Sequence, residues 1–178
     1  MFNIQAKPPI YDPEAVQPMR DELIYCGFEE LTSPEKLDEV LSAKNDETIL
    51  VFVNSVCGCA AGSARPGVTL ALQNEIIPDR LTTVFAGQDR DSVDLLRSKF
   101  LNKFPPSSPS LALLKNGEVI FMMQRFNIEG RYPEEIAADL INVFNQNCKR
   151  KGPSISKEKF EKLEYFRSCG SKIPLNEN

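Results

Sequence analysis

The chain contains the stretch Thr48-Ile49-Leu50-Val51-Phe52-Val53-Asn54-Ser55-Val56-Cys57-Gly58-Cys59-Ala60. Its first six residues are a continuous run of apolar and β-branched side chains, which predicts a strand buried on both faces at the centre of an α/β sheet. The strand is expected to end at Asn54 and Ser55, immediately before two cysteines and a helical segment. Because active sites of α/β sheets lie at the carboxyl ends of the strands, Cys57 and Cys59 are the first candidates for chemistry.

The segments around this strand show helical and extended patterns in turn. Asp12 is a suitable N-cap for one helix and Thr32 or Ser33 for a second, and Gly27 is a suitable helix end. Asn116-Gly117 between two apolar runs is a strong signal for a β-hairpin. The predicted helices cover residues 12–26, 34–41, 68–75, 91–100 and 133–147, and the predicted strands cover residues 48–53, 81–87, 111–114 and 119–123. This order predicts an α/β fold in which helices flank a central mixed β-sheet.

Two parts of the chain are distinguished by composition. Residues 1–148 are interpreted as one domain with an N-terminal helical segment. Residues 149–178 begin with the basic, breaker-rich run Lys149-Arg150-Lys151-Gly152-Pro153, which predicts a linker. A short helix at residues 157–167 and a polar tail are expected after it.

The composition excludes several classes of function. The 178 residues carry a net charge of −4, which argues against a nucleic-acid partner. The chain has no histidine, so it can form neither a Cys-His dyad, nor a Ser-His-Asp triad, nor a His-ligated metal site. The N-terminus lacks the pattern of a signal peptide and no apolar run is long enough to span a bilayer, so we expect a soluble cytoplasmic protein without a membrane partner.

The cysteine pattern points to redox chemistry. Five cysteines at uneven spacing make a poor framework for a secreted disulfide protein, and a close pair in a reducing compartment indicates a redox or metal site. The partial positive charge and the unpaired amide hydrogens of the helix N-terminus that follows the pair would stabilise a thiolate. Arg65 is a further source of positive charge, and Gly58 would permit the unusual backbone angles of a small Cys-Gly-Cys ring. A strained ring of this kind is more easily reduced than a relaxed disulfide.

Other interpretations of these residues stay open on composition alone. The two cysteines could be small buried apolar side chains, as free cysteines often are. A zinc site is disfavoured because zinc takes four nitrogen or sulfur ligands and the remaining cysteines are isolated, so we expect no metal. The Ser108-Pro109 bond precedes the strand expected beside residues 48–53; a cis form would shape the surface next to the sulfurs, but a plain loop proline is the more common case.

Three stretches resemble the bacilliredoxin family, and the order of elements resembles the thioredoxin fold. The stretches are Tyr11-Asp12-Pro13 with Val16-Gln17-Pro18-Met19-Arg20-Asp21-Glu22-Leu23, then Gly27-Phe28-Glu29-Glu30-Leu31, and Val53-Asn54-Ser55-Val56-Cys57-Gly58-Cys59-Ala60-Ala61-Gly62-Ser63-Ala64-Arg65-Pro66-Gly67. The resemblance covers residues 10–147, and its third stretch is long enough to be specific.

The resemblance implies a thioredoxin-like three-layer fold and a thiol–disulfide oxidoreductase. Such a protein removes bacillithiol, a low-molecular-weight thiol, from mixed disulfides on S-thiolated client proteins. Cys57 would take the thiol adduct and Cys59 would resolve it, with the small thiol as co-substrate and no other cofactor. The supporting residues would be those around the pair and on the neighbouring loop, namely Asn54, Ser55, Gly58, Ala60, Arg65, Ser108 and Pro109.

Three alternatives to this function remain at this point: a general disulfide isomerase, a thiolate metal-binding protein, and a redox-sensing interaction module. The other cysteines inherit no role from the resemblance. Cys26 is expected in the core, whereas Cys148 and Cys169 are expected as passive surface thiols, with electron transfer to the active pair as the alternative.

Overall fold

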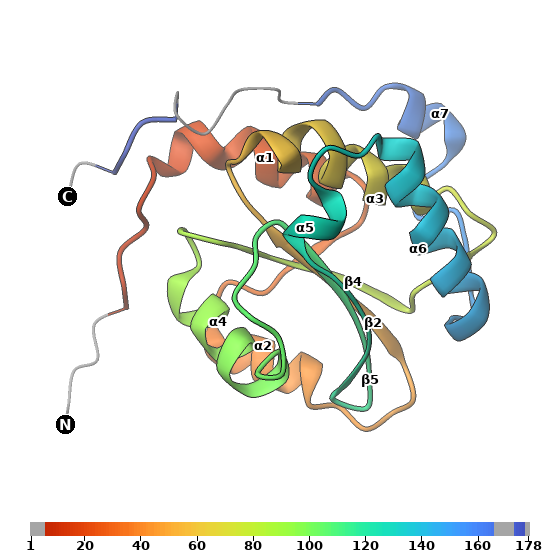
Figure 1. The fold of residues 1–178 in the computed structure, drawn as a ribbon, viewed down its shortest axis with the longest axis horizontal. Coiled ribbons are helices and arrows are strands. Elements are labelled where there is room, and N and C mark those ends of the chain that lie inside the picture. Colours follow the sequence, from red (N-terminus) through yellow and green to blue (C-terminus); the bar gives the residue numbers. More distant parts are fainter. Residues whose placement is uncertain (1–5, 166–172, 177–178) are drawn as a thin grey trace.

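The computed structural model describes residues 6–165 and 173–176, and a five-stranded mixed sheet runs through its centre (Figure 1). The strands, in spatial order, are β1 (Glu29–Glu30), β4 (Arg80–Phe85), β2 (Thr48–Asn54), β5 (Ser110–Lys115) and β6 (Glu118–Met123). β1 and β2 both run parallel to β4, whereas β5 is antiparallel to β2 and to β6. The predicted central strand is therefore the middle strand of the sheet, and it is buried along its whole length.

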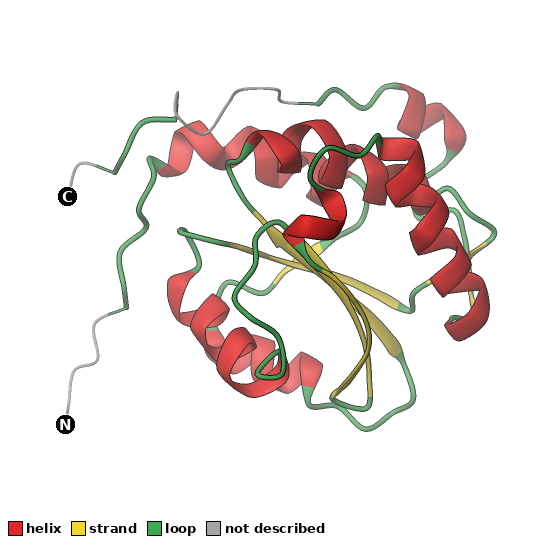
Figure 2. Cartoon of the chain, in the orientation of Figure 1, coloured by secondary structure: helices red, strands yellow, loops and turns green. Residues whose placement is uncertain are grey.

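Helices cover both faces of the sheet, which gives three layers (Figure 2). One face carries α1 (Pro13–Tyr25), α3 (Arg65–Ala71) and α6 (Pro133–Asn147), and the other carries α2 (Pro34–Leu41) and α4 (Arg90–Leu95). Along β2, Leu50 and Phe52 belong to the core on the first face, and Ile49, Val51 and Val53 to the core on the second. This period-two alternation with apolar residues on both sides explains the continuous apolar run. The predicted fold class, a thioredoxin-like α/β fold, is confirmed.

The ends of the long elements follow the predicted signals. The Asp12 side chain accepts a hydrogen bond from the Glu14 amide, and Ser33 accepts one from the Lys36 amide. Gly27 follows α1 with φ = +96°, a left-handed conformation that glycine adopts without steric cost. Asn116 and Gly117 also have positive φ, at 51° and 78°, as expected in the tight turn of the β5–β6 hairpin.

The helices next to the cysteines depart from the prediction. A π-helical turn, η1 (Ala60–Ala64), runs directly into α3, and the change occurs beside Pro66, which has no amide hydrogen to donate. α3 ends at Ala71 rather than at residue 75, before the short strand β3 (Ile76–Ile77). The predicted helix at residues 91–100 ends in a second π-helical segment, η2 (Leu96–Phe100).

The segment after residue 148 does not form the predicted linker. Arg150–Lys151 is a strand, β7, that pairs antiparallel with β3, and the Gly152 amide donates to the Glu75 carbonyl at 2.9 Å. Ile155 and Leu163 pack against the core, on either side of α7 (Lys157–Glu161). This helix was predicted to continue to residue 167, but it ends at Glu161, and residues 162–165 are not helical.

The segments around Tyr11 and Leu175, near the two ends of the chain, lie side by side (Figure 1). Tyr11 and Leu175 form an isolated antiparallel bridge, and the Asp12 amide donates to the Pro174 carbonyl at 2.9 Å. Ile173 is buried in a small cluster with Val16, Met19, Val56 and Phe85. Within residues 6–165 and 173–176, no helix combines the length and the apolar character that a membrane crossing requires.

Candidate active site

The cysteine pair lies where the prediction placed it, at the carboxyl end of β2. The Ala86 amide donates to the Asn54 carbonyl at 2.9 Å and so ties this end of β2 to the chain that leaves β4. Cys57 and Cys59 are both half-buried free thiols, and their Sγ atoms lie 2.7 Å apart. The site is therefore a dithiol in which one sulfur can reach the other directly.

The Cys57 sulfur accepts hydrogen bonds from several donors. Ser55 Oγ lies 3.2 Å from it and the Ala60 amide nitrogen 3.4 Å. Burial disfavours the charged form of Cys57, but the hydrogen bonds from Cys59, Ser55 and Ala60, together with the charge of Arg125, outweigh burial and hold the pKa of Cys57 below its ordinary value. The Ala60 amide is the predicted helix-terminus donor, and the Ser55 hydroxyl acts with it.

The pKa of Cys59 is shifted in the opposite direction. Burial, the hydrogen bond to Cys57 and the negative charge of Cys57 raise the pKa of Cys59 to about 11, with Glu129 adding to this effect and Arg125 opposing it. The thiolate is the attacking species. Because Cys57 has the lower pKa, it ionises before Cys59 and is the more reactive of the two thiols.

A buried polar network holds the loop that carries these donors. Arg65 and Glu22 form a fully buried ion pair, with Nε 2.6 Å from Oε2. The same guanidinium donates to Asn54 Oδ1 and to the Ser55 carbonyl, both at 3.2 Å. Asn54 Oδ1 also accepts from the Ser55 amide at 2.9 Å. Arg65, suggested as a source of charge at the thiol, is thus bound to Glu22, to the Asn54 side chain and to the Ser55 carbonyl.

The backbone angles predicted for Gly58 in a closed Cys-Gly-Cys ring stay a prediction. Gly58 lacks a positive φ in this dithiol form, and a Cβ added there would meet no atom within 4 Å. The special angles were predicted for a closed Cys-Gly-Cys ring, which this form does not contain. Gly58 is exposed, and it lines a groove beside the site.

The loop of Ser108 and Pro109 also lies where the prediction placed it, immediately before β5, the neighbour of β2. The Ser108-Pro109 peptide bond is cis, and Pro109 is buried. A short helix, α5 (Arg125–Ile128), lies against this loop, because the Arg125 amide donates to Ser107 Oγ at 2.7 Å.

Arg125 was not identified from the sequence. Its charge acts on both thiols, although it lies far from them along the chain. A topological signal was present, since β6 runs parallel to β2 in the sheet and Arg125 follows the end of β6. The carboxyl ends of parallel strands meet at the same sheet edge, which brings α5 to the cysteines.

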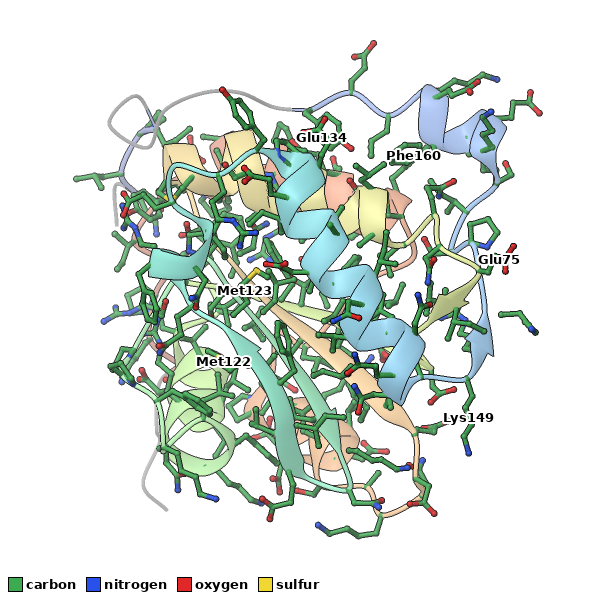
Figure 3. The ribbon with its side chains drawn as sticks, turned by 45° about the vertical axis from the view of Figure 1, so that its right-hand side comes forward. Glu75, Met122, Met123, Glu134, Lys149 and Phe160 are labelled. Carbon is green, nitrogen blue, oxygen red and sulfur yellow. The ribbon has the colours of Figure 1, made fainter. Side chains whose placement is uncertain are left out.

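Two grooves flank the site. The α7 groove has a volume of about 600 Å³ and is lined by residues that include Gly58, Pro66, Glu134, Phe160 and Tyr165. Figure 3 shows Glu134 at the start of α6 and Phe160 on α7, two of its walls. The α5 groove has a volume of about 390 Å³ and is lined by residues that include Pro105, Ser107, Ser108, Arg125, Phe126 and Glu129.

The remaining described cysteines are buried. Cys26 lies in the core as predicted, and burial with the charge of Glu22 raises its pKa to about 12. Cys148 was expected at the surface, and this was wrong: it belongs to the buried core, with 8% exposure, and burial raises its pKa. Cys169 lies outside the described residues. Within the described part of the chain, no three Cys, Asp or Glu side chains gather in a way that could hold a metal ion.

Several known proteins resemble this chain. Residues 11–148 match a family model described as disulphide isomerase. A bacilliredoxin of Salinibacter ruber is 46% identical over 80% of this chain and 83% of its own length. A bacilliredoxin of Shouchella clausii is 49% identical over 79% of this chain and 95% of its own length. The solution structure of oxidised thioredoxin from Plasmodium falciparum covers 66% of this chain and 98% of that chain, with 15% identity and a TM-score of 0.40.

A strand-end dithiol in a thioredoxin-like sheet, together with these relatives, defines a thiol–disulfide redox protein. More narrowly, the chain belongs to the bacilliredoxin family, as the identity over most of its length shows.

Proposed function

We propose that this protein is a thiol–disulfide oxidoreductase that removes bacillithiol, or a related low-molecular-weight thiol, from mixed disulfides on client proteins. The observation that carries the proposal is the difference between the two thiols. Cys57 has a lowered pKa and several hydrogen-bond donors, whereas Cys59 has a raised pKa of about 11 and lies 2.7 Å away. One thiol is prepared to attack and the other is kept protonated within reach.

The reaction consists of two exchanges. The Cys57 thiolate attacks the sulfur of the small thiol, forms a mixed disulfide with it, and releases the client as a thiolate. Cys59 then loses its proton and attacks the Cys57 sulfur. This second exchange forms the Cys57–Cys59 disulfide and releases the small thiol. The two electrons that reduce the mixed disulfide come from the dithiol, and an external thiol or dithiol reductant restores it.

The loop residues support the first exchange. The Ser55 hydroxyl and the Ala60 amide stabilise the thiolate before attack, and Asn54 and Arg65 hold the loop that presents them. The proposed partners are S-thiolated client proteins, and the reducing environment of the cytoplasm suits a dithiol resting state. No resident cofactor takes part in either exchange.

The test uses a client peptide capped with bacillithiol. The reduced wild type should release the free peptide, and Cys57→Ala should release none above the background. Cys59→Ala should stop after the first exchange and retain the small thiol on Cys57, which intact-protein mass spectrometry detects. Release by Cys57→Ala at the wild-type rate would disprove the mechanism. Cys26→Ala, a change in the core away from the pair, is the matched control for loss of a cysteine.

General disulfide isomerisation is the second candidate, favoured by the description of the matching family model. An isomerase reactivates a scrambled multi-disulfide protein without any small-thiol adduct. Reactivation by Cys59→Ala as well as by the wild type would support isomerisation, since an isomerase can begin and end with Cys57 alone. Release of bacillithiol without any such reactivation would support the first function.

A further inference from the structure

The short helix α5 is fixed between the cis-proline loop and the helix that follows the cysteines. On one side, the Arg125 amide donates to Ser107 Oγ at 2.7 Å and Gln124 Nε2 donates to the Pro105 carbonyl at 3.3 Å. On the other side, Ser63 Oγ, in η1, donates to the Arg131 carbonyl at 2.6 Å. These hydrogen bonds hold α5 and the α5 groove next to the thiols.

Arg125 presents an exposed cation at this position. Its guanidinium contacts Glu129, with Nη2 3.3 Å from Oε1, and both side chains are about half exposed, at 48% and 62%. An exposed pair of this kind contributes little to stability, so an anion from a ligand can replace Glu129 at small cost. Arginine also has five N–H donors in a planar fork that matches a carboxylate.

The groove around Arg125 has the size and lining of a small-ligand site. Its volume of about 390 Å³ lies in the range of pockets that take small molecules. The walls combine proline rings, the Ser107 and Ser108 side chains, and the ring of Phe126, which is 72% exposed. The α7 groove differs in charge: its lining includes the Glu134 carboxylate, and none of the described residues that line it is cationic.

We propose that Arg125 determines specificity by binding a carboxylate of the small thiol that is joined to Cys57, with the body of that thiol lying in the α5 groove. The inference rests on the proposed attack by Cys57. It names the class of thiol as one that carries a carboxylate, in preference to a neutral or cationic thiol of the same size.

The experiment measures mixed-disulfide formation on Cys57 in the full-length Cys59→Ala background. The protein is equilibrated with redox buffers of 3-mercaptopropionate, 2-mercaptoethanol or cysteamine, each with its own symmetric disulfide. In every case the Cys57 thiolate forms a disulfide with one thiol and releases the other. Intact-protein mass spectrometry gives the three equilibrium constants. Because any accessible thiol undergoes this exchange, the measurement does not depend on removal of bacillithiol from clients.

We expect the equilibrium constant for mixed-disulfide formation to be largest with the anionic thiol, smaller with the neutral thiol and smallest with the cationic thiol. The anionic thiol should be favoured over the neutral one by about tenfold, which is the effect of one hydrogen-bonded ion pair. Arg125→Gln should bring the anionic-to-neutral ratio close to one, and Arg125→Lys should retain part of it. Arg125 also influences the pKa of Cys57, but this influence is common to the three buffers and cancels in the ratio.

The matched control is Lys149→Gln, which removes one exposed positive charge at the far end of α6, away from Met123 at the end of β6 (Figure 3). It should leave the ratio unchanged. An unchanged ratio in Arg125→Gln would overturn the inference, as would a ratio that responds to Glu134→Gln instead, since that places the thiol in the α7 groove. If the Cys59→Ala protein shows the preference but the wild type releases no capped client, the proposed function alone is refuted.

Discussion

Ser55 is the residue that links the fold most directly to the chemistry of the site. Its hydroxyl donates to the Cys57 sulfur at 3.2 Å, and the same oxygen accepts from the Cys57 amide at 3.3 Å. The side chain is buried, so water cannot easily replace this hydrogen bond. The chain has no histidine, so a serine hydroxyl and a backbone amide, in place of an imidazole, stabilise the thiolate.

Replacement of Ser55 tests this role. Ser55→Ala should slow the alkylation of Cys57 by iodoacetamide at pH 7 by about tenfold, because a hydrogen bond to a charged group contributes about 1.5 kcal/mol. The wild-type rate should rise with pH to a midpoint below about 8.5, the ordinary value for a thiol, and Ser55→Ala should move the midpoint upward.

Ser98→Ala is the control, since Ser98 is exposed and remote from the cysteines. Equal midpoints for the wild type and Ser55→Ala would show that the hydroxyl does not stabilise the thiolate.

The sequence predicted the local residues of the site and missed the distant one. Cys57, Cys59 and the Ala60 amide follow from a buried strand that meets a helix, a pattern readable within a dozen residues. The partner of Arg65 was not readable, because Glu22 comes from a different helix and the pairing depends on how α1 and α3 pack. Arg125 was missed for the same reason, since its approach depends on the whole sheet.

At the scale of elements, the buried ion pair connects α1 to α3 beneath the active loop. Arg65 is fully buried, and the Glu22 side chain is 2% exposed. Removal of one partner of such a pair leaves an uncompensated charge in the interior, whereas replacement of both by apolar side chains of similar volume is often tolerated. The pair therefore makes α1, α3 and the loop depend on one another.

Glu22→Gln should lower the free energy of unfolding by about 3–5 kcal/mol, measured by urea denaturation. The double variant Glu22→Met/Arg65→Met should recover a large part of this loss. Glu29→Gln is the control, because Glu29 pairs with Lys36 and Arg80 near the surface and should cost less than about 1 kcal/mol. If Glu22→Gln were as stable as Glu29→Gln, the pair would not hold the loop.

The predicted elements that matched were those with many residues and clear ends. The closing helix was predicted at residues 133–147 and observed at Pro133–Asn147, because its N-terminal proline and its apolar spacing agree. The strands β1, β3 and β7 have two residues each and α5 has four, too few to show a periodicity. The π-helical turns were also missed, since their side-chain spacing barely differs from that of an α-helix over five residues.

At the scale of the whole molecule, residues 149–165 form a strap over the core rather than a separate tail. β7 attaches the strap to β3, and Phe160 and Tyr165 carry it to the α7 groove. The family match ends at residue 148, and the basic composition of residues 149–153 suggested only a linker. The pairing of β7 with β3 consists of backbone hydrogen bonds, which most side chains permit, so the composition did not predict it.

Gly152 is the point at which this attachment can be tested. A Cβ at Gly152 would lie 2.0 Å from the Asn74 carbonyl oxygen, so Gly152→Ala should separate β7 from β3. We expect a loss of about 1–3 kcal/mol in the free energy of unfolding, typical of overpacking, and faster trypsin cleavage after Arg150 and Lys151 under native conditions.

Gly62→Ala is the matched control. A Cβ at Gly62 meets no atom within 4 Å, and alanine favours a helical conformation, so this variant should be at least as stable as the wild type. Cleavage of Gly152→Ala at the wild-type rate would show that the strap does not depend on this close approach.

The pairing of the two chain arms has a consequence for the order of assembly. The hydrogen bond from Asn176 Nδ2 to the Pro9 carbonyl joins residues 167 positions apart, and the Tyr11–Leu175 bridge closes a loop of similar length. Contacts of this separation carry a high loop-closure entropy until the sheet has formed between them. We therefore expect Ile173 to reach Val56 late in folding, so that the cluster beneath the active loop is completed after the rest of the molecule.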